Sequence, residues 1–346
     1  MAKSLANVQA LRAQERRARG GAPAEPIQIL RSRDDIVRAC GTGGAVGTTG
    51  YLNPTSGWAD AEAGMRYLHA RVRALGRVAF VTGRVARLLI DHGAAAVRGA
   101  QLDGGAALAA ELTVVAAGAW TPALLDLRGV ASATGQVLAY VALTPAEQAA
   151  LAGAPVQLDM GTGLFAVPPH RRLLKVARHG YGYTNPVAVP HPEQDPARPG
   201  GRDAIVVSLP RTTLDDPGLR IPAEGEAACR RALREMVPRL ADRAFSHTRI
   251  CWYTDTPRGD FLITYHPRYG RSLFVATGGS GHGFKFMPVI GDKIVECILG
   301  RMPEEFKEKW AWPQERLEEG LWTGDGSRGG RRGMVLGEEL KKGGKL

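Results

Sequence analysis

Residues 272–300 combine three features that together restrict the fold. Residues 272–277 are rich in β-branched and aromatic side chains, 278–283 are rich in glycine, and an apolar-periodic run continues to Ile298. This order predicts a strand, a turn and a helix. Free backbone N–H groups and the helix dipole favour a negatively charged ligand at such a turn, and glycine lets the ligand approach the backbone closely. The segment therefore predicts a site for an anionic cofactor.

Composition indicates a folded enzyme of moderate size. A chain of 346 residues, 44% hydrophobic and 23% charged, can bury a substantial core and would usually form two domains. No apolar run approaches the roughly 20 residues that span a bilayer, so we expect no integral membrane segment. The net charge of +11 comes from Lys and Arg scattered among acids, which does not favour nucleic-acid binding. The four cysteines lack CxxC spacing, so we expect neither a metal site nor a disulfide scaffold.

A second strand and glycine unit lies earlier in the chain. Residues 60–75 have the pattern of an amphipathic helix, and residues 77–102 predict a β-meander of three strands, at 78–81, 85–90 and 95–102. The apolar stretch 112–120 then runs through Ala117 and Gly118 into a predicted helix at 122–127. This arrangement is typical of the back half of a dinucleotide-binding domain.

Residues 134–249 have a different character. They mix predicted strands at 135–143, 173–178 and 204–209 with a helix at 224–236 and several proline-rich loops. We interpret them as a second, substrate-facing domain inserted into the first.

The opening unit of a dinucleotide domain is not found in the sequence. That unit has a strand, G-x-G-x-x-G, a helix and an acidic residue about 20 residues later. The glycines at 41–47 (GTGGAVG) lack this spacing and no helix follows them, so they predict a loop.

Both ends of the chain are basic. Residues 1–20 are arginine-rich with an apolar rhythm, which fits a helix of the mature protein or an amphipathic transit peptide. Residues 326–346 are rich in Gly, Arg and Lys and are expected to lie over the surface or free of it. The terminal Gly344-Lys345-Leu346 is close to the Ser-Lys-Leu peroxisomal signal.

Four stretches resemble a known family: GYLNPTSGWADAEAG, LTVVAAGAWTPALLDL, RICWYTDTPRGDFLITYHP and LFVATGGSGHGFKFMPVIGDKIVE. They are similar to the flavin-dependent amine oxidases of the monomeric sarcosine oxidase, pipecolate or saccharopine oxidase and fructosyl amino acid oxidase group. The resemblance implies an α/β fold with an inserted α+β substrate domain. It also implies a Rossmann-like FAD-binding domain of the glutathione-reductase/D-amino-acid-oxidase type, incomplete here because the G-x-G-x-x-G unit is missing.

Domain boundaries follow from this comparison. We expect the FAD-binding domain at 60–130 and 268–320, and the substrate domain at 41–59 and 131–267. Residues 1–40 form an N-terminal helical segment and 321–346 a basic tail.

The family activity is oxidation of the C–N bond of a secondary or modified amino acid. The product imine hydrolyses, and oxygen becomes hydrogen peroxide. The resemblance favours a substrate of the sarcosine, pipecolate or saccharopine type over a fructosyl amino acid. It also implies FAD as cofactor, an amino acid and oxygen as small-molecule partners, no nucleic acid, a monomer, and a peroxisomal or cytoplasmic location.

Three residues match reactive positions of the family. Cys251 matches the cysteine that forms a thioether to the flavin, although a lone cysteine is more often a buried structural residue. Lys285 matches the lysine beside the flavin and the substrate carboxylate, and an anion at this helix start would pair with it. Lys175 matches the cation that promotes the reaction with oxygen, whereas the residues alone favour an outward-facing charge on an edge strand.

Further positions match cofactor or substrate contacts. The glycine-rich stretch would place its amides near the flavin, although His282 could equally cap the helix and Trp120 could equally be a core side chain. Tyr51 and Phe165 are candidate substrate-pocket aromatics or ordinary packing residues. The full set of cofactor candidates is Val85, Ala117, Gly118, Trp120, Cys251, Gly278, Gly279, Ser280, Gly281, His282, Gly283, Phe284 and Lys285.

Two functions remain open from the sequence. The first is a flavin amine oxidase, for which Lys175, Cys251 and Lys285 should converge on one cavity. The second is a non-catalytic remnant that binds an amino acid or a partner protein, and exposed apolar sheet edges would favour it. Since the G-x-G-x-x-G unit is missing, we expect weak or absent FAD binding by the chain as given.

Overall fold

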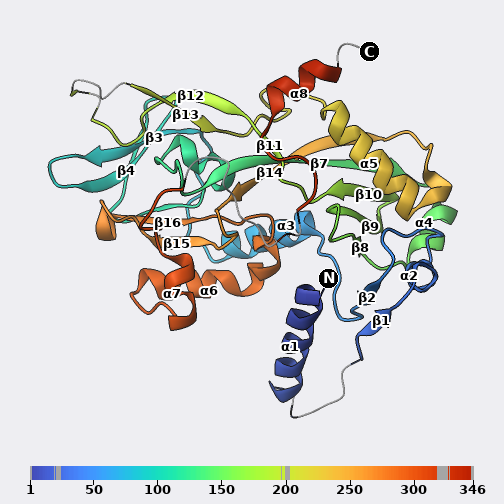
Figure 1. Cartoon of the computed structure of the whole chain (residues 1–346). Helices are drawn as coiled ribbons and strands as arrows, with labels where there is room; N and C mark the ends of the chain where they lie inside the picture. The colour runs from blue at the N-terminus through green and yellow to red at the C-terminus, as the bar shows by residue number, and fades with distance from the viewer. Residues whose placement is uncertain are drawn as a thin grey trace.

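The computed structural model describes residues 2–18, 20, 25–195, 197–198, 203–317, 326 and 328–343. Its largest element is a seven-stranded sheet around β7 (Ser132–Ala142). Antiparallel β14 (His247–Asp255) pairs with β7 on one edge, and β10 (Leu173–Arg178) pairs with the other. Figure 1 shows these long strands at the centre of the molecule. The sheet also contains β8 (Gln157–Leu158), β9 (Leu164–His170), β11 (Tyr183–Thr184) and β17 (Met334–Val335).

One face of this sheet is buried beneath α5 (Ala223–Met236). Val137, Ala139 and Val141 of β7 pack there against Leu233 and Met236 of the helix. Successive residues of a strand point to opposite faces, so the alternate positions of β7 lie on the side away from α5. An ideal Cβ at Gly225 would fall 2.7 Å from a Val137 methyl group, so only glycine allows the helix to pack this closely. The opposite face is buried at Thr134, Gln136 and Leu138 and more open around Tyr140 and Cys251. We call it the ligand-accessible face.

An ion pair attaches the start of α5 to the sheet. Arg178, at the end of β10, donates to both carboxylate oxygens of Glu224 at 2.5 and 2.8 Å, and Tyr183 donates its hydroxyl to the same carboxylate. Burial alone raises the pKa of Glu224, but the hydrogen bonds from Arg178 and Tyr183 outweigh it and lower that pKa. The carboxylate therefore stays charged in the fold.

The second layer is smaller. It contains a three-stranded sheet in the order β15 (Leu262–Tyr265), β16 (Leu273–Thr277) and β6 (Thr113–Val115), with β16 and β6 parallel. The helices α6 (Met287–Ile298) and α7 (Glu304–Trp310) contact β15. A separate antiparallel sheet contains β3 (Val85–Asp91), β4 (Ala96–Leu102) and β5 (Ala107–Ala109).

The other elements are short or peripheral. They are α1 (Ala2–Ala18), β1 (Gln28–Leu30), α2 (Arg33–Cys40), β2 (Gly50–Leu52), α3 (Ala61–Ala74), η1 (Gly118–Ala123), α4 (Pro145–Leu151), β12 (Pro186–Pro190), β13 (Ala204–Ser208), η2 (Pro238–Leu240), η3 (Gly270–Ser272) and η4 (Gly283–Phe286). Among the described residues no helix is both long and apolar enough to cross a membrane.

The described part of the basic tail is incorporated into the large sheet. The amide of Gly329 donates to the carbonyl of His179 at 2.9 Å, and β17 extends the sheet beside β11. An ideal Cβ at Gly329 would fall 1.6 Å from the carbonyl oxygen of Thr162, so the tail approaches this backbone as only glycine permits. The last described helix, α8 (Leu336–Gly343), packs against α5. The expectation of a surface or free tail is therefore wrong for residues 328–343, while residues 344–346 lie outside the described residues.

Several expected elements differ in the structure. Residues 78–81 form no strand; Val78, Phe80 and Val81 are each more than half exposed, and no neighbouring strand pairs with them. The third strand of the meander is instead β5. The helix expected at 122–127 is the 3-10 turn η1, which begins earlier at Gly118. The glycines at 41–47 form a loop as predicted, and Gly41 ends α2 with a φ of 64°.

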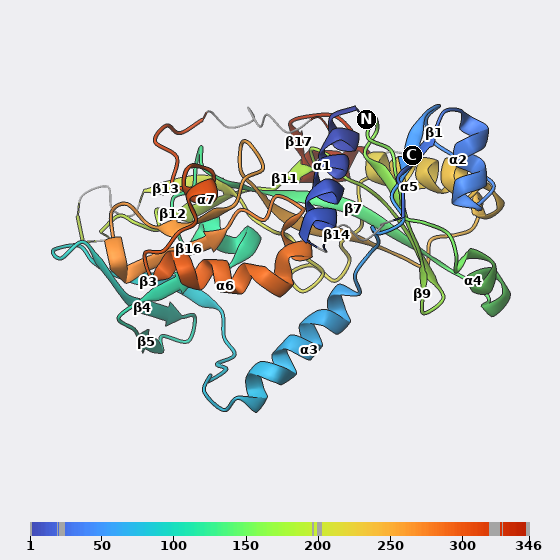
Figure 2. The same ribbon diagram turned by 90° about the horizontal axis from the view of Figure 1, so that it is seen from below.

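Apolar surface is exposed on the smaller layer. None of the described residues of α3 is buried, and Figure 2 shows this helix projecting from the rest of the molecule. Met65, Tyr67 and Leu68 on α3 are 39–69% exposed. Val114 is 43% exposed on β6, which is an edge strand. This is the kind of surface that favours the second of the two functions left open by the sequence.

A buried polar cluster links the loop after β12 to the smaller layer. His266 is 4% exposed, with its Nε2 3.6 Å from Glu193 Oε2 and its ring stacked on Tyr269. Glu193 also accepts from the amide of Asp126 at 2.8 Å. Burial, with smaller contributions from Arg268 and Arg316, lowers the pKa of His266 to about 4. The imidazole is therefore neutral at neutral pH.

Replacing Arg178 should destabilise the fold. Arg178→Met removes both hydrogen bonds to Glu224, and we expect unfolding free energy to fall by about 2 kcal/mol, since a third of the carboxylate side chain remains exposed. Urea unfolding measures this. The matched control is Arg231→Met, which removes a surface pair with Glu235 and should cost about 0.5 kcal/mol or less. If both variants lower the unfolding free energy equally, the ion pair of Arg178 with Glu224 does not stabilise the packing of α5 on the sheet.

Acid should destabilise the protein through His266. Its folded pKa of about 4 lies below the unfolded value of about 6.5, so the unfolded chain takes up the proton first and stability is lost as pH falls between these values. Between pH 7 and pH 5 we expect a loss of about 2 kcal/mol from this group. His266→Gln should have a correspondingly smaller loss over the same interval in urea unfolding. If the unfolding free energy falls equally with pH in the wild-type protein and in His266→Gln, His266 does not cause the loss of stability.

Candidate functional site

A cavity of about 920 Å³ lies between the ligand-accessible sheet face, α1 and the smaller layer. Its walls come from segments that are distant in sequence: the start of α1, β9, the end of β14, the glycine-rich turn after β16, and the tail. The lining residues that bear on its chemistry are Lys3, Phe165, Tyr181, Tyr253, Asp255, Arg258, Ser280, Gly281, His282, Lys285, Arg328 and Arg332.

The glycine-rich turn is shaped by close approaches of its backbone. Gly278 and Gly281 both have a φ of 76°, and an ideal Cβ at Gly281 would fall 2.4 Å from the ring of Tyr253. Ser280 also has a positive φ, 47°, and it is held by its amide, which donates to the carbonyl of Thr254 at 2.9 Å. No atom lies within 4 Å of an ideal Cβ at Gly279, so the backbone there is open to a ligand. The helix expected directly after the glycines begins with η4, and α6 starts only at Met287.

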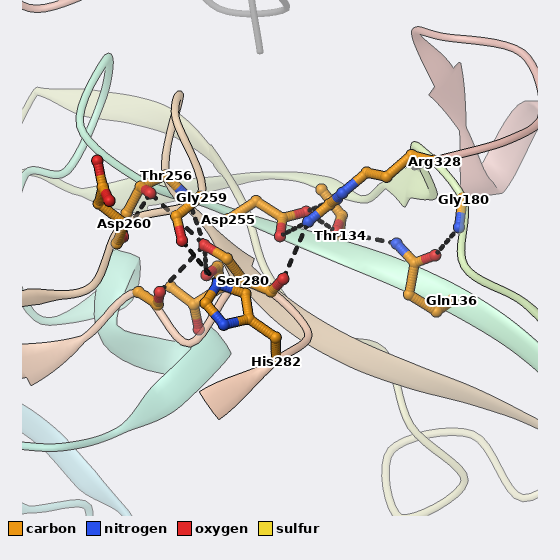
Figure 3. A network of polar contacts seen from close by, with 12 residues as sticks. Thr134, Gln136, Gly180, Asp255, Thr256, Gly259, Asp260, Ser280, His282 and Arg328 are labelled. Atoms are coloured by element: carbon orange, nitrogen blue, oxygen red, sulfur yellow. Dashed lines mark hydrogen bonds and ion pairs between the residues drawn. The ribbon is translucent and has the colours of Figure 1, made fainter. Parts of the chain in front are cut away.

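A buried ion pair contacts this turn at Ser280, as Figure 3 shows. Arg328 donates to both oxygens of Asp255, at 2.5 and 2.6 Å, and to the carbonyl of Ser280 at 3.2 Å. Asp255 is 2% exposed and also accepts from the hydroxyl of Thr134. Gln136 extends the network by donating to Thr134 and accepting from the amide of Gly180. The tail, the sheet and the glycine-rich turn are thus joined by a single hydrogen-bond network.

Lys285 and His282 follow the turn on the cavity side. His282 Nε2 lies 2.7 Å from the carbonyl oxygen of Gly259, and its ring stacks on Phe261. Lys285 is exposed, with Nζ 5.2 Å from the centroid of the Phe286 ring. Among the described residues no carboxylate forms an ion pair with Lys285, so its charge can act on a ligand in the cavity.

Lys175 and Cys251 lie on the ligand-accessible sheet face. Lys175 pairs with Tyr140 of β7 and Cys251 pairs with Gln136, two positions that share one face of the strand. Lys175 Nζ is 5.6 Å from the centroid of the Phe165 ring. Burial lowers the pKa of Lys175; the neighbouring Cys251 raises it, and Arg249 lowers it further. Cys251 is exposed on this face and is therefore not the buried structural cysteine of the alternative interpretation.

Only Lys285 of these three lines the cavity. The expected convergence of Lys175, Cys251 and Lys285 on one cavity is therefore not observed among the described residues. Phe165 connects the two places, because it lines the cavity and also contacts Lys175. The arrangement is one extended site with a cavity and an adjoining open sheet face.

The remaining predicted residues are arranged around the carboxyl ends of β6 and β16. Gly118 has a φ of 54°, its backbone is open, and its carbonyl accepts from Thr277 at 3.4 Å. Trp120 is 51% exposed, so it is not the core side chain of the alternative interpretation. Val85 is half-buried at the start of β3. The other predicted cofactor positions, Ala117, Gly283 and Phe284, lie in or beside the two turns without lining the cavity.

Tyr51 lies one contact away from the cavity. Its hydroxyl is 2.7 Å from Ser4 Oγ, and Ser4 is a lining residue of α1. The contact ties α1 to β2 and so helps to place the helix over the cavity.

The two open turns fit a dinucleotide. They lie side by side after parallel strands, which is where α/β sheets bind nucleotide ligands, and their backbone is free of close neighbours at Gly118 and Gly279. The described residues contain no cluster of His, Cys, Asp and Glu that could hold a metal ion. The open backbone of the two turns fits an anionic cofactor such as FAD.

Sequence reasoning missed the contributions of the two ends of the chain. Lys3 and Arg332 line the cavity, and Arg328 supports the glycine-rich turn, although all three lie in segments expected to be peripheral. The only available signal was that the tail carries glycines next to its arginines, as at 328–333. That pattern is also typical of free tails, so it did not distinguish a tail that lines the cavity from a tail that is free of the fold.

Residues 2–297 match the family model described as FAD dependent oxidoreductase. The chain is 32% identical to amino acid oxidase fsqB of Aspergillus fumigatus, over 87% of this chain and 69% of that protein. It is 31% identical to L-saccharopine oxidase of Schizosaccharomyces pombe, over 76% and 60%. The crystal structure of fructosamine oxidase (Amadoriase II) from Aspergillus fumigatus aligns with a TM-score of 0.77 at 31% identity, covering 90% of this chain and 73% of that one.

These similarities agree with the geometry of the two turns and with the mixed α/β architecture. The chain spans about 60–69% of the length of the two oxidases named first. Its family, unlike its substrate, follows from both sequence and structure. The chain belongs to the family of FAD-dependent oxidoreductases that includes these amino acid oxidases.

Proposed function

We propose that the protein is an FAD-dependent oxidase of the C–N bond of a secondary or modified amino acid, of the sarcosine, pipecolate or saccharopine type. The reaction removes the amine N–H hydrogen and one α-hydrogen, with two electrons, to give an imine, and it reduces O₂ to H₂O₂. Water then hydrolyses the imine to a carbonyl compound and an amine. The observation that carries the proposal is the cavity, which is lined by Ser280 and Gly281 of the glycine-rich turn and by Lys285, next to the open backbone at Gly279.

FAD, when bound, supplies the two-electron chemistry that transfers the substrate's hydrogens to oxygen. The chain's own residues provide position and charge. The amides of Gly279 and Gly281 would be directed at the cofactor, because those of Ser280, His282 and Gly283 already donate to the carbonyls of Thr254 and Gly279. Ala117 and Gly118 would contact its pyrophosphate side. The ion pair of Arg328 with Asp255 keeps the Ser280 carbonyl in place and so holds the turn in one conformation.

Lys285 is the group that we assign to the substrate carboxylate. It is exposed to the cavity, and no acid neutralises it among the described ion pairs. A lysine ammonium offers three donors and a point charge, which suits a carboxylate. Binding at this end would orient the amine toward the sheet face that carries Phe165 and Lys175.

Lys175 is the group that we assign to oxygen. Electron transfer to O₂ develops negative charge, and a preplaced cation in a partly buried position stabilises that charge. Burial lowers the pKa of Lys175, which is the effect expected of a desolvated ammonium. Cys251 lies on the same sheet face and is exposed, as covalent attachment of a flavin would require.

A second function is favoured by one observation. The apolar exposure of α3 and of the β6 edge offers a surface that another polypeptide could cover. Under this alternative the chain is a binding module for an amino acid or a protein and has no oxidase activity.

The visible absorption spectrum of the purified 346-residue protein distinguishes these functions. An oxidase would show a flavin spectrum, either as purified or with excess FAD, which offsets the weak binding expected from the sequence. It would also form peroxide with N-substituted amino acids. A protein that stays colourless with excess FAD would contradict the oxidase proposal and favour the binding module.

Cys251 is tested by acid precipitation. In the wild-type protein we expect the flavin to remain in the pellet, and in Cys251→Ser it should appear in the supernatant. The matched control is Cys297→Ser, because Cys297 is buried in the apolar core of the smaller layer. Release of flavin from the wild-type protein would show that the cofactor is not covalently bound.

Lys175 is tested by the reaction with oxygen. Lys175→Met should slow oxidation of the substrate-reduced protein by O₂ by about a hundredfold, while substrate reduction under anaerobic conditions stays within a few-fold. Stopped-flow absorbance separates the two steps. The control Lys293→Met removes a helix-surface cation paired with Glu296 and should change neither step. An unchanged rate with O₂ would exclude this role.

A further inference from the structure

The helix α3 carries an apolar seam that the rest of the described chain leaves uncovered. Ala61, Met65, Leu68, Val72 and Leu75 follow one another at intervals of four, three, four and three residues. Such intervals match the a and d positions of a heptad and place these side chains on one face of a helix. Met65, Leu68 and Leu75 are 50%, 39% and 67% exposed. Since the apolar stripe of a surface helix normally faces a core, this seam indicates a contact that the described residues do not provide.

The start of α3 is attached to the rest of the molecule. Asp60 is the N-cap and accepts from the amide of Ala63 at 3.0 Å, while its other carboxylate oxygen lies 3.2 Å from His170 Nε2 at the end of β9. An ideal Cβ at Gly64 would fall 3.3 Å from the methyl group of Met287, so the first turn also touches α6. Beyond this turn the helix projects from the molecule (Figure 2). The seam is therefore presented on a formed helix, which lowers the entropy that docking would cost.

A second copy of the same helix fits this seam in an antiparallel orientation. With a two-fold axis between Met65 and Leu68, Met65 of each copy faces Leu68 of the other. Ala61 then faces Val72, so a small side chain lies opposite a branched one in the next layer. The helix has 14 residues and is about 21 Å long, so these layers fit along it. Both halves of such a contact come from α3 itself.

The charges of α3 favour the antiparallel orientation. Glu62 lies in the first turn, and Arg71 and Arg73 lie in the last. Glu62 is 2.6 Å from Arg66 in a pair whose side chains are both exposed, and among the described residues no ion pair includes Arg71 or Arg73. In the antiparallel pair Glu62 lies at the level of Arg71 of the second copy, so the acidic start of each helix is beside the basic end of the other. A parallel pair would instead bring the basic ends and the like ends of the helix dipoles together.

We infer that the protein self-associates through α3, which packs against α3 of a second copy in an antiparallel, two-fold symmetric contact. The contact involves neither FAD nor a substrate, so it holds for an oxidase and for a binding module alike. It replaces the monomer expected from the family resemblance with a pair of chains. One helix pair is smaller than a standard interface, so we expect a weak dimer with a Kd on the order of 10 µM.

Sedimentation equilibrium of the full chain, without added FAD, measures this Kd over concentrations from about 1 to 200 µM. Leu68→Glu places a carboxylate at the centre of the seam in both copies and should weaken association by at least about a hundredfold. The matched control is Tyr67→Glu, because Tyr67 is 69% exposed on the same helix and lies outside the seam. This variant adds the same charge and should leave the Kd within about twofold of the wild-type value. Far-UV circular dichroism checks that both variants fold.

Charge reversal tests the orientation, and it decides the matter should Leu68→Glu fail to fold. Glu62→Arg places two arginines at one level of the pair, and Arg71→Glu places two glutamates there. Each variant alone should associate about tenfold more weakly than the wild-type protein. An equimolar mixture of the two should recover the wild-type affinity, because every arginine then lies opposite a glutamate.

Several outcomes would overturn the inference. A wild-type chain that stays monomeric at about 200 µM would do so and would leave the seam to a different polypeptide. Association that survives Leu68→Glu, or that Tyr67→Glu abolishes as well, would place the contact elsewhere. A mixture of the two charge variants that associates no better than either alone would exclude the antiparallel arrangement.

The measurement separates this inference from the proposed function. A monomer that forms peroxide from an N-substituted amino acid would sink the inference alone. A dimer that stays colourless with excess FAD would sink the oxidase proposal alone.

Discussion

The pairing of β7 with β14 and β10 is the constraint on which the rest of the molecule depends. One face of β7 supplies Val137 and Ala139 to the core beneath α5, and the other presents Gln136 and Tyr140. Because side chains alternate along a strand, a slip of one residue would exchange the two faces. The apolar contacts beneath α5 therefore also fix the direction of the side chains on the ligand-accessible face. Core packing and site geometry are set by the same register.

The sequence predicted the fold most accurately where local pattern and tertiary packing agree. Residues 173–178 and 224–236 were expected as a strand and a helix and occur almost unchanged as β10 and α5, because both place apolar residues at the period of their element. Residues 78–81 have equally good strand composition but no partner strand, so they form none. Composition shows what a segment can form, whereas the partner that decides the outcome is distant in sequence.

In the candidate site, too, local features could be predicted from the sequence and contacts between distant segments could not. The turn at 278–283 could be predicted because its glycines are needed locally, for positive φ and for the approach of Tyr253 to Gly281. Arg328 and Arg332 could not, because nothing near them in sequence shows that they would reach Asp255 or Tyr181. The charge of the cavity is therefore a tertiary property. The buried carboxylate of Asp255 forms an ion pair with Arg328. Arg332 instead donates to the hydroxyl of Tyr181, which does not offset its charge.

The path of the tail has a consequence for how the molecule is made. Gly329 inserts between backbone segments near residues 162 and 179, so one wall of the cavity consists of chain that is synthesised after the strands it contacts. Contacts of such long sequence separation form slowly, because a large loop must close before they contribute. The six strands of the large sheet that precede Arg328 in the chain can assemble on the ribosome while the cavity is still open at the side of Asp255. The Asp255 carboxylate lacks this guanidinium partner until Arg328 emerges. The binding site is thus completed only after Arg328 has emerged from the ribosome.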